Sequence, residues 1–296
     1  MRLKQKQKRY IMKAKLKQAK SKHGVYFIAE LGQNHNGCLQ TAYKMIDSLV
    51  GTGVSAIKTA KRDIDVCLSE EKKQSIYDNP NSFGITYYEH RKALELSKDD
   101  FIKLKQYAEI SGFDFISSFT DLNSLDFLCD IGIKTLKIAS QRIQDVSLLK
   151  AAARTNKPII ISTGMSSILD VELAMYIFEN NTKYLLQCTS AYPCKEEDIN
   201  LNVIKYYKDY YQADGYGLSG HHAGIAPDIA AYVMGADIIE RHYTLSRAMK
   251  GTDHSASLER RGVELILKYI SEISKAFGNY KKQILECEKP AIKKLR

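Results

Sequence analysis

Short apolar runs alternate with longer amphipathic stretches along most of the chain. Eight runs of four or five residues have the apolar character of strands that are buried on both faces, as in parallel sheets. These runs are 25–29, 54–58, 113–117, 135–138, 158–162, 184–187, 215–219 and 237–240. The pattern therefore predicts eight strands of a parallel sheet.

Stretches with helical periodicity lie between these runs. In 39–50, for example, Ala42, Met45, Ile46 and Leu49 fall on one helix face. Further helices are predicted at 99–110, 124–129, 146–153, 168–178 and 263–277. The polar segment 66–96 is too long for an ordinary connection, and we expect an extended loop of the kind that carries function.

Eight strand-then-helix units predict a (β/α)8 TIM barrel. A doubly wound sheet is the alternative, but such sheets usually have fewer strands and a G-x-G-x-x-G turn after the first one. Residues 32–37 read GQNHNG here and lack that spacing. We expect one barrel domain over residues 23–296, preceded by a basic extension over residues 1–22.

The formal net charge of +10 arises in the N-terminal extension. Residues 1–22 contain no Asp or Glu, and the rest of the chain is close to neutral. The ten basic residues are Arg2, Lys4, Lys6, Lys8, Arg9, Lys13, Lys15, Lys17, Lys20 and Lys22. We expect a solvated helix or a disordered arm, and nucleic acid is an unlikely partner for the barrel.

The chain has no apolar block typical of a secretory signal and no run of about 20 apolar residues that would span a bilayer. Its cysteines show no C-x-x-C spacing, which favours free thiols over a disulfide framework. They are Cys38, Cys67, Cys129, Cys188, Cys194 and Cys287. We expect a cytoplasmic protein without a membrane span.

A polar side chain ends nearly every predicted strand. In a barrel the carboxyl ends of the strands meet at one mouth, where active sites lie. Packing alone does not explain polar residues at the ends of so many strands, since Lys and Glu are costly to bury unpaired. The set is Glu30, Lys58, Ser118, Lys137, Ser140, Ser162, Thr163, Thr189, Ser190, Ser219, His221, Glu240 and His242.

Two lysines in this set suggest an anion site. Lys58 and Lys137 come from different strands and are placed to converge on one anion. The hydroxyls of Ser140, Ser162 and Ser190, with nearby N–H groups, would complete a phosphate cradle. The alternative is that each lysine pairs with a carboxylate inside the barrel mouth.

Two histidines suggest a metal site. His221 and His242 end consecutive strands, so their imidazoles are placed to share one ion. Two neutral imidazoles with a carboxylate and waters suit a divalent metal such as Mn, Fe, Co or Zn. Glu30 and Asp253 are the carboxylates best placed to join them as ligand, outer partner or proton carrier. His35, in the first loop, is expected to contact substrate.

These residues lie in motifs that resemble the N-acetylneuraminate (sialic acid) synthase family. The resemblance runs from about Tyr26 to Leu258, covers the barrel, and lacks the family's C-terminal antifreeze-like domain. Its motifs, in order, are IAELGQNHNG at 28–37, KIAS at 137–140, STGM at 162–165, QCTSAYP at 187–193, SGH at 219–221, IERHYTL at 239–245 and GTDH at 251–254.

The resemblance implies a barrel enzyme that condenses phosphoenolpyruvate with an N-acylated amino-sugar aldehyde, N-acetylmannosamine or a related hexosamine. The products would be a nonulosonic acid and phosphate. It implies a divalent metal, Mn²⁺ or Mg²⁺, on His221 and His242, and it favours a homodimer. Carried over, the residues that bind phosphoenolpyruvate are Lys58, Ser118, Lys137, Ser140, Ser162, Ser190 and Ser219.

By the same resemblance, Glu30, Tyr192 and Asp253 would face the sugar and metal. We take Glu30, Lys58, Lys137 and Asp253 as catalytic. The further substrate contacts are Asn34, His35 and Tyr192.

Two positions depart from the family pattern. Ala60 stands where the family often has Gln two residues after the lysine, which removes one sugar-facing amide. Gly220 stands where it often has Asp. Two alternatives remain: a phosphoenolpyruvate-dependent 3-deoxy-ulosonate synthase that uses another aldose, and an inactive barrel that binds a partner. The retained His221, His242 and Lys137 argue against the inactive barrel.

Overall fold

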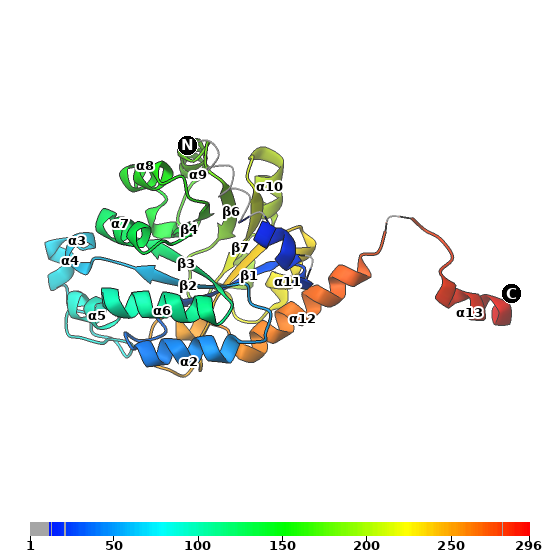
Figure 1. Ribbon diagram of the computed structural model, residues 1–296, viewed down its shortest axis with the longest axis horizontal. Coiled ribbons are helices and arrows are strands. Elements are labelled where there is room, and N and C mark those ends of the chain that lie inside the picture. The colour runs from blue at the N-terminus through cyan, green and yellow to red at the C-terminus, as the bar shows by residue number, and fades with distance from the viewer. Residues whose placement is uncertain (1–11, 13, 21, 280) are drawn as a thin grey trace.

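The computed structural model describes residues 12, 14–20, 22–279 and 281–296. Eight parallel strands close into a barrel in chain order, and helices surround it (Figure 1). The strands are β1 (Tyr26–Gly32), β2 (Ala56–Lys61), β3 (Asp114–Phe119), β4 (Thr135–Ile138), β5 (Ile159–Ser162), β6 (Lys183–Cys188), β7 (Gly215–Gly220) and β8 (Ile238–His242). The predicted TIM barrel and its eight strands are confirmed.

The predicted helices are confirmed with end shifts of up to three residues. They are α2 (Leu39–Leu49), α6 (Lys98–Ile110), α7 (Leu122–Asp130), α8 (Val146–Arg154), α9 (Ile168–Ile177) and α12 (Arg260–Ala276). Two further barrel helices, α10 (Asn202–Tyr210) and α11 (Ala226–Val233), were not predicted. A last helix, α13 (Lys289–Leu295), lies apart from the barrel body in Figure 1.

The segment after β2 is more ordered than the extended loop we predicted. It contains three short helices, α3 (Ile64–Cys67), α4 (Glu70–Gln74) and α5 (Tyr87–Ala93). Thr86 closes a capping box with Glu89 at the start of α5. The long polar segment is therefore a small folded cover beside the barrel mouth.

Alternation along the strands positions the site. In β1, Phe27 and Ala29 join the large outer core between strands and helices, whereas Tyr26 and Ile28 join a smaller cluster inside the barrel. Glu30 continues the inward series, because side chains two apart on a strand share a face. Other strands repeat the pattern, for example Ile160 followed by Ser162. The inward positions are apolar at the amino ends and polar at the carboxyl ends.

A helix over residues 14–20 closes the amino end of the barrel. Met12 and Leu16 are buried in the inner cluster beneath Tyr26 and Tyr184. Lys15 pairs with Asp114 and Lys20 pairs with Asp237. For the described part of the basic extension, the expected solvated arm is wrong, because one helix face is buried; residues 1–11, 13 and 21 lie outside the described residues.

Within the described ranges, no helix combines the length and the apolar character that crossing a bilayer requires.

Candidate active site

A cavity of about 310 Å³ opens at the carboxyl ends of the strands. It brings together twelve of the fourteen residues predicted for the site. They are Glu30, Lys58, Ser118, Lys137, Ser140, Ser162, Ser190, Tyr192, Ser219, His221, His242 and Asp253. Strand register explains part of this grouping, since Glu30 lies beside Lys58 on one side and His242 on the other.

Two lysines and two glutamates form the floor of the cavity. Lys58 Nζ donates to Glu30 and lies 3.5 Å from Glu240 Oε1. Lys137 Nζ donates to Ser162 Oγ at 2.6 Å and to Glu240 Oε1 at 3.0 Å. Each lysine thus pairs with a carboxylate, which was the alternative to a bare anion site. When all four groups are ionised the charges balance.

The pKa values of Glu240, Lys137 and Lys58 on the cavity floor are shifted from their ordinary values. Burial opposes ionisation of Glu240, but the charges of Lys137 and Lys58 outweigh it and lower the pKa of Glu240 to about 2. Burial lowers the pKa of Lys137, and the charge of Lys58 adds to that effect while Glu240 opposes it. The pKa of Lys58 shifts in the opposite direction, since the adjacent carboxylates raise it despite burial.

Small hydroxyl side chains surround the Lys137 end of the floor. The Gly164 N–H donates to Ser140 Oγ at 3.0 Å. A Cβ at Gly164 would lie 2.9 Å from Ser140 Oγ and 3.0 Å from Cys188 Sγ, and closer still to Ser190 Oγ. Only glycine lets these groups approach so closely. The result is a cradle of hydroxyl and N–H donors beside a buried ammonium, which suits a phosphate group.

The two histidines lie beside this cradle, since His221 Nδ1 is 3.9 Å from Cys188 Sγ, which is itself 3.3 Å from Ser140 Oγ. Their ring centroids are 5.3 Å apart, and the Tyr192 ring contacts both. His221 Nδ1 donates to the Thr189 carbonyl at 2.9 Å, so Nε2 is the nitrogen that can act as a ligand when the ring is neutral. Burial opposes protonation of this ring, but the neighbouring Cys188 and the Thr189 carbonyl outweigh it and raise the pKa of His221. Burial lowers the pKa of His242 to about 4, so its imidazole is neutral at pH 7, the form that binds metals.

The residues beside the histidines fit a divalent metal. His242 Nδ1 is buried without a hydrogen-bond partner and lies 3.7 Å from Asp253 Oδ2. Within the described part of the chain, no three His, Cys, Asp or Glu side chains already gather as a complete metal site. The donor set is therefore two imidazoles and a nearby carboxylate, which waters or substrate would complete.

Comparison with known proteins decides the family. Residues 45–282 match the NeuB family. The chain belongs to the NeuB family. It is 36% identical to the human N-acetylneuraminate-9-phosphate synthase over 92% of this chain and 77% of that protein. It is also 34% identical to the N,N'-diacetyllegionaminic acid synthase of Legionella pneumophila, over 90% of this chain and 76% of that protein.

The solved structures agree with this placement. The N-acetylneuraminic acid synthetase of Leptospira borgpetersenii, solved with citrate, superposes with a TM-score of 0.80 at 32% identity, covering 91% of this chain and 90% of that one. The NeuB relatives are synthases of sialic, legionaminic and pseudaminic acids. The chain is therefore a member of a nonulosonic acid synthase family with a TIM-barrel fold.

Two predicted substrate contacts of this NeuB barrel do not line the cavity. Asn34 is buried and donates to the Tyr243 carbonyl at 2.8 Å and to Ser257 Oγ at 2.9 Å. His35 Nδ1 accepts the Gly37 N–H at 3.1 Å, and burial lowers the pKa of His35 to about 4. Both side chains support the loop after β1, whereas their neighbour Gln33 reaches the cavity.

Several lining residues of the NeuB cavity were not predicted. Ala60 lines the cavity where the family often has Gln, so this wall carries a methyl group instead of an amide. Gly32, Gln33, Ala139, Met165 and Cys188 lie within the sequence motifs given above. The others are Arg62, Tyr87, Arg91, Thr120 and Gln141.

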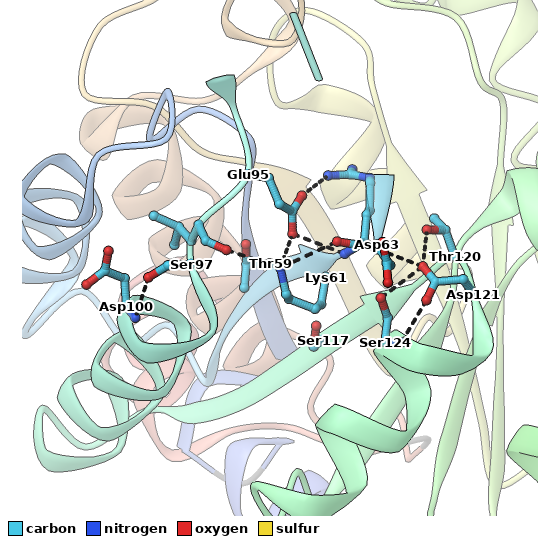
Figure 2. A network of polar contacts seen from close by, with 12 residues as sticks. Thr59, Lys61, Asp63, Glu95, Ser97, Asp100, Ser117, Thr120, Asp121 and Ser124 are labelled. Carbon is cyan, nitrogen blue, oxygen red and sulfur yellow. Dashed lines mark hydrogen bonds and ion pairs between the residues drawn. The ribbon is translucent and has the colours of Figure 1, made fainter. Parts of the chain in front are cut away.

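A polar network fixes the chain as it leaves β2 (Figure 2). Lys61 Nζ donates to Glu95 Oε1 at 2.6 Å and to the Leu96 carbonyl at 3.1 Å. The Asp63 N–H donates to Asp121 Oδ2 at 2.9 Å, and Asp121 also caps α7 through the Ser124 N–H. The network joins the β2 end to α6 and α7, and it fixes the backbone on both sides of Arg62.

Proposed function

We propose that this chain condenses phosphoenolpyruvate with an N-acylated amino-sugar aldehyde, N-acetylmannosamine or a related hexosamine, to give a nonulosonic acid and phosphate. One observation carries the proposal. A single cavity joins a hydroxyl cradle with a buried lysine to a histidine pair with a nearby carboxylate. The cradle suits a phosphoryl group, and the histidine pair suits activation of a carbonyl.

Phosphoenolpyruvate would lie over the floor of the cavity. Its phosphate fits the cradle formed by Lys137, Ser140 and Ser190, because Gly164 places no side chain between these donors and its N–H orients the Ser140 hydroxyl. Its carboxylate then extends toward Lys58 and Ser118. Such an orientation leaves C3 directed toward the histidines.

The carboxylates serve the carbon–carbon bond formation. C3 of phosphoenolpyruvate attacks the aldehyde carbon, and the aldehyde oxygen takes up a proton. Positive charge develops at C2, which the neighbouring carboxylates of Glu30 and Glu240 stabilise. Glu30 then removes a proton from a water that adds to C2. The C2–O bond to phosphate breaks, the C2 hydroxyl gives up its proton to the departing phosphate, and the keto acid forms.

A divalent metal would be held by His221 and His242, with Asp253 or Glu30 as the adjoining carboxylate. When bound, the ion supplies Lewis-acid polarisation of the sugar aldehyde. Imidazole ligands favour Mn²⁺ over Mg²⁺, which prefers oxygen. The Thr189 carbonyl fixes the tautomer of His221, so this side chain needs no rearrangement to bind the ion.

Phosphate release separates the proposal from its alternatives. The protein is incubated with phosphoenolpyruvate, Mn²⁺ and a panel of aldoses, and released phosphate is measured. Release with N-acylated hexosamines alone supports the proposal. Release only with other aldoses favours a 3-deoxy-ulosonate synthase. A folded protein that releases none with any sugar favours a barrel without catalysis.

The relatives' names leave one property of the acceptor open. The human, mouse and Drosophila relatives are named for a 9-phosphate product, whereas bacterial relatives are named for legionaminic and pseudaminic acids. Identity to the animal and legionaminic acid synthases is similar. Overall similarity therefore does not decide whether the sugar carries a phosphate.

We propose a homodimer that uses α9. Apart from Asp170 and Glu172, this helix carries only apolar residues and one tyrosine, a composition more typical of a helix that is buried on most sides. Yet Leu169 is 71% exposed and Tyr176 is 72% exposed, and Ile168 and Leu173 are also exposed. Light scattering should give a dimer for the native chain and a monomer for Leu169→Asp. A native monomer would contradict the proposal.

We also propose that the reaction takes place in the cytosol. All six cysteines are free thiols in the structure, and two of them, Cys188 and Cys194, are buried. Free thiols are typical of reducing compartments. Fractionation of the native cells, followed by detection of the protein, tests this location.

A further inference from the structure

Two arginines on one side of the cavity play no part in the proposed reaction. Arg62 follows β2 directly, and Arg91 lies on α5. Both line the same 310 Å³ cavity as the histidines and the floor lysines. Neither residue occurs in a motif identified from the sequence.

Protein carboxylates do not balance the charge of these arginines. Arg62 Nη1 lies 3.5 Å from Glu95 Oε2, but Glu95 already pairs with Lys61 at 2.6 Å. The Arg62 Nε is buried without a partner. Among the described residues, Arg91 contacts Gln33 Oε1 at 2.8 Å and the Tyr87 ring at 5.9 Å. Arg62 thus shares Glu95 with Lys61, and in the described part of the chain Arg91 has no carboxylate within ion-pair distance.

The two guanidinium groups also affect each other. Burial lowers the pKa of Arg91, and the nearby charge of Arg62 lowers it further. Asp253 is the other carboxylate near them, and their charges contribute to lowering its pKa, but it also faces His242. A pair of cations held together in a partly buried site is stabilised when an anion binds between them.

The backbone at Arg62 is held in place before any ligand binds. The Arg62 N–H donates to Glu95 Oε1 at 3.1 Å, and the next residue, Asp63, donates its N–H to Asp121. These contacts belong to the network of Figure 2. The arginine is therefore part of a fixed wall, which lowers the entropic cost of binding.

A chain of hydrogen bonds connects Arg91 to the histidine side of the cavity. Gln33 accepts from Arg91 and donates through Nε2 to Thr252 Oγ1 at 3.1 Å. Thr252 Oγ1 donates to Asp253 Oδ1 at 2.8 Å, and Asp253 Oδ2 faces His242. The arginines therefore lie on the side of β8, β1 and β2. In the closed barrel, the phosphate cradle of β4–β6 lies opposite.

We propose that Arg62 and Arg91 form a second anion subsite that binds a phosphate monoester at the far end of the sugar acceptor. This inference rests on the proposed function and makes the acceptor a phosphorylated N-acyl hexosamine. Phosphoenolpyruvate uses the opposite wall, so the anion here belongs to the other substrate. Paired guanidinium groups present several N–H donors that match phosphate oxygens.

The test compares N-acetylmannosamine with its 6-phosphate at saturating phosphoenolpyruvate. We expect the native enzyme to prefer the phosphorylated sugar. Arg62→Gln and Arg91→Gln should each lower kcat/KM for that sugar by about ten- to hundredfold, mainly through KM. The same variants should change kcat/KM for the free sugar by less than about threefold, the scale of a weak neutral contact.

Lys92→Gln is the matched control, because Lys92 neighbours Arg91 on α5 but pairs with Asp65 outside the cavity. It should leave both sugars unaffected. An equal loss for both sugars in the arginine variants would overturn the subsite. So would a native enzyme that turns over the free sugar equally well, although that result would support the proposed function.

Calorimetry separates the subsite from the reaction. If no sugar is turned over, the proposed function fails, but binding of the 6-phosphate to native protein can still be measured. Binding that needs both arginines and the phosphorylated sugar supports the subsite. Binding of inorganic phosphate that is as tight as binding of the sugar phosphate overturns it, since the site would then hold free phosphate.

Discussion

The mouth and the base of this barrel bury different kinds of side chain within the same eight strands. At the base, Tyr26 and Ile28 pack with Met12 and Leu16, and the ion pairs lie at the rim. At the mouth, the same inward positions carry lysine, glutamate and histidine that are almost fully buried. The base also borders the larger cavity, about 480 Å³ compared with 310 Å³.

The contrast indicates that buried charge, and not cavity size, distinguishes the proposed active site from the base. Apolar side chains stabilise the base when they are buried, and they need no partner of opposite charge. Buried ions at the mouth are costly unless they are paired, and pairing of this kind is weak evidence for stability. We therefore expect substitutions at the mouth to affect turnover most and substitutions at the base to affect stability alone.

The largest effect is expected at the histidines. His221→Ala or His242→Ala removes a proposed metal ligand and should lower turnover by roughly a thousandfold or more. Calorimetric titration with Mn²⁺ should show loss of binding. His23→Ala at the base is the control, because His23 packs against Gly53, far from the mouth. Native activity in either mouth variant would refute the metal assignment.

The second largest effect is expected at Lys137 and Glu240, the buried ion pair on the cavity floor. Lys137→Met leaves Glu240 with Lys58 at 3.5 Å and the Ser219 hydroxyl at 3.1 Å, and it should cost about 3 to 5 kcal/mol of unfolding free energy. Urea unfolding measures that cost. The double variant Lys137→Met/Glu240→Gln should recover most of the stability without recovering turnover. If the double variant regained activity, Lys137 would have no role in the reaction.

A smaller effect is expected at the apolar base. Leu16→Ala removes a buried side chain beneath the strands and should cost about 2 kcal/mol. Thermal or urea unfolding should detect the loss, while kcat/KM stays at the native value. A drop in kcat/KM at a temperature where the variant is fully folded would show that the base and the mouth are coupled.

The smallest effect is expected at the rim of the base. Lys20→Ala removes an ion pair with Asp237 in which the lysine side chain is 44% exposed, so the cost should be below about 1 kcal/mol. Added salt should reduce the difference from the native chain. If Lys20→Ala lowered the unfolding free energy as much as Leu16→Ala does, the surface ion pair would contribute as much stability as the buried apolar contact, and the prediction would be wrong.

The barrel and most of its mouth were predictable because each strand carries its own signal. An apolar run gives the strand, alternation gives its inward face, and the polar residue at its end marks the mouth. Ile160 and Ser162 illustrate this in a single short strand. None of these inferences requires knowledge of contacts between distant segments.

The arginines and the N-terminal helix were missed for a different reason. Arg62 and Arg91 reach the cavity because Glu95 and Asp121 hold the segment after β2, and no periodicity in that polar segment reports such contacts. In the basic N-terminal extension, the many lysines and arginines made the few apolar positions of a buried helix face hard to recognise. Met12, Leu16 and Ala19 have the spacing of one helix face, and all three pack in the inner cluster.

The helix beneath the barrel also constrains the order of assembly. Its lysines contact Asp114 and Asp237, which are 99 and 217 residues further along the chain. Loop closure over such separations is entropically costly, so these contacts form late. A segment that leaves the ribosome early thus finds its binding surface only when β8 has been synthesised. Docking of this helix would therefore occur only after all eight strands of the barrel have been synthesised.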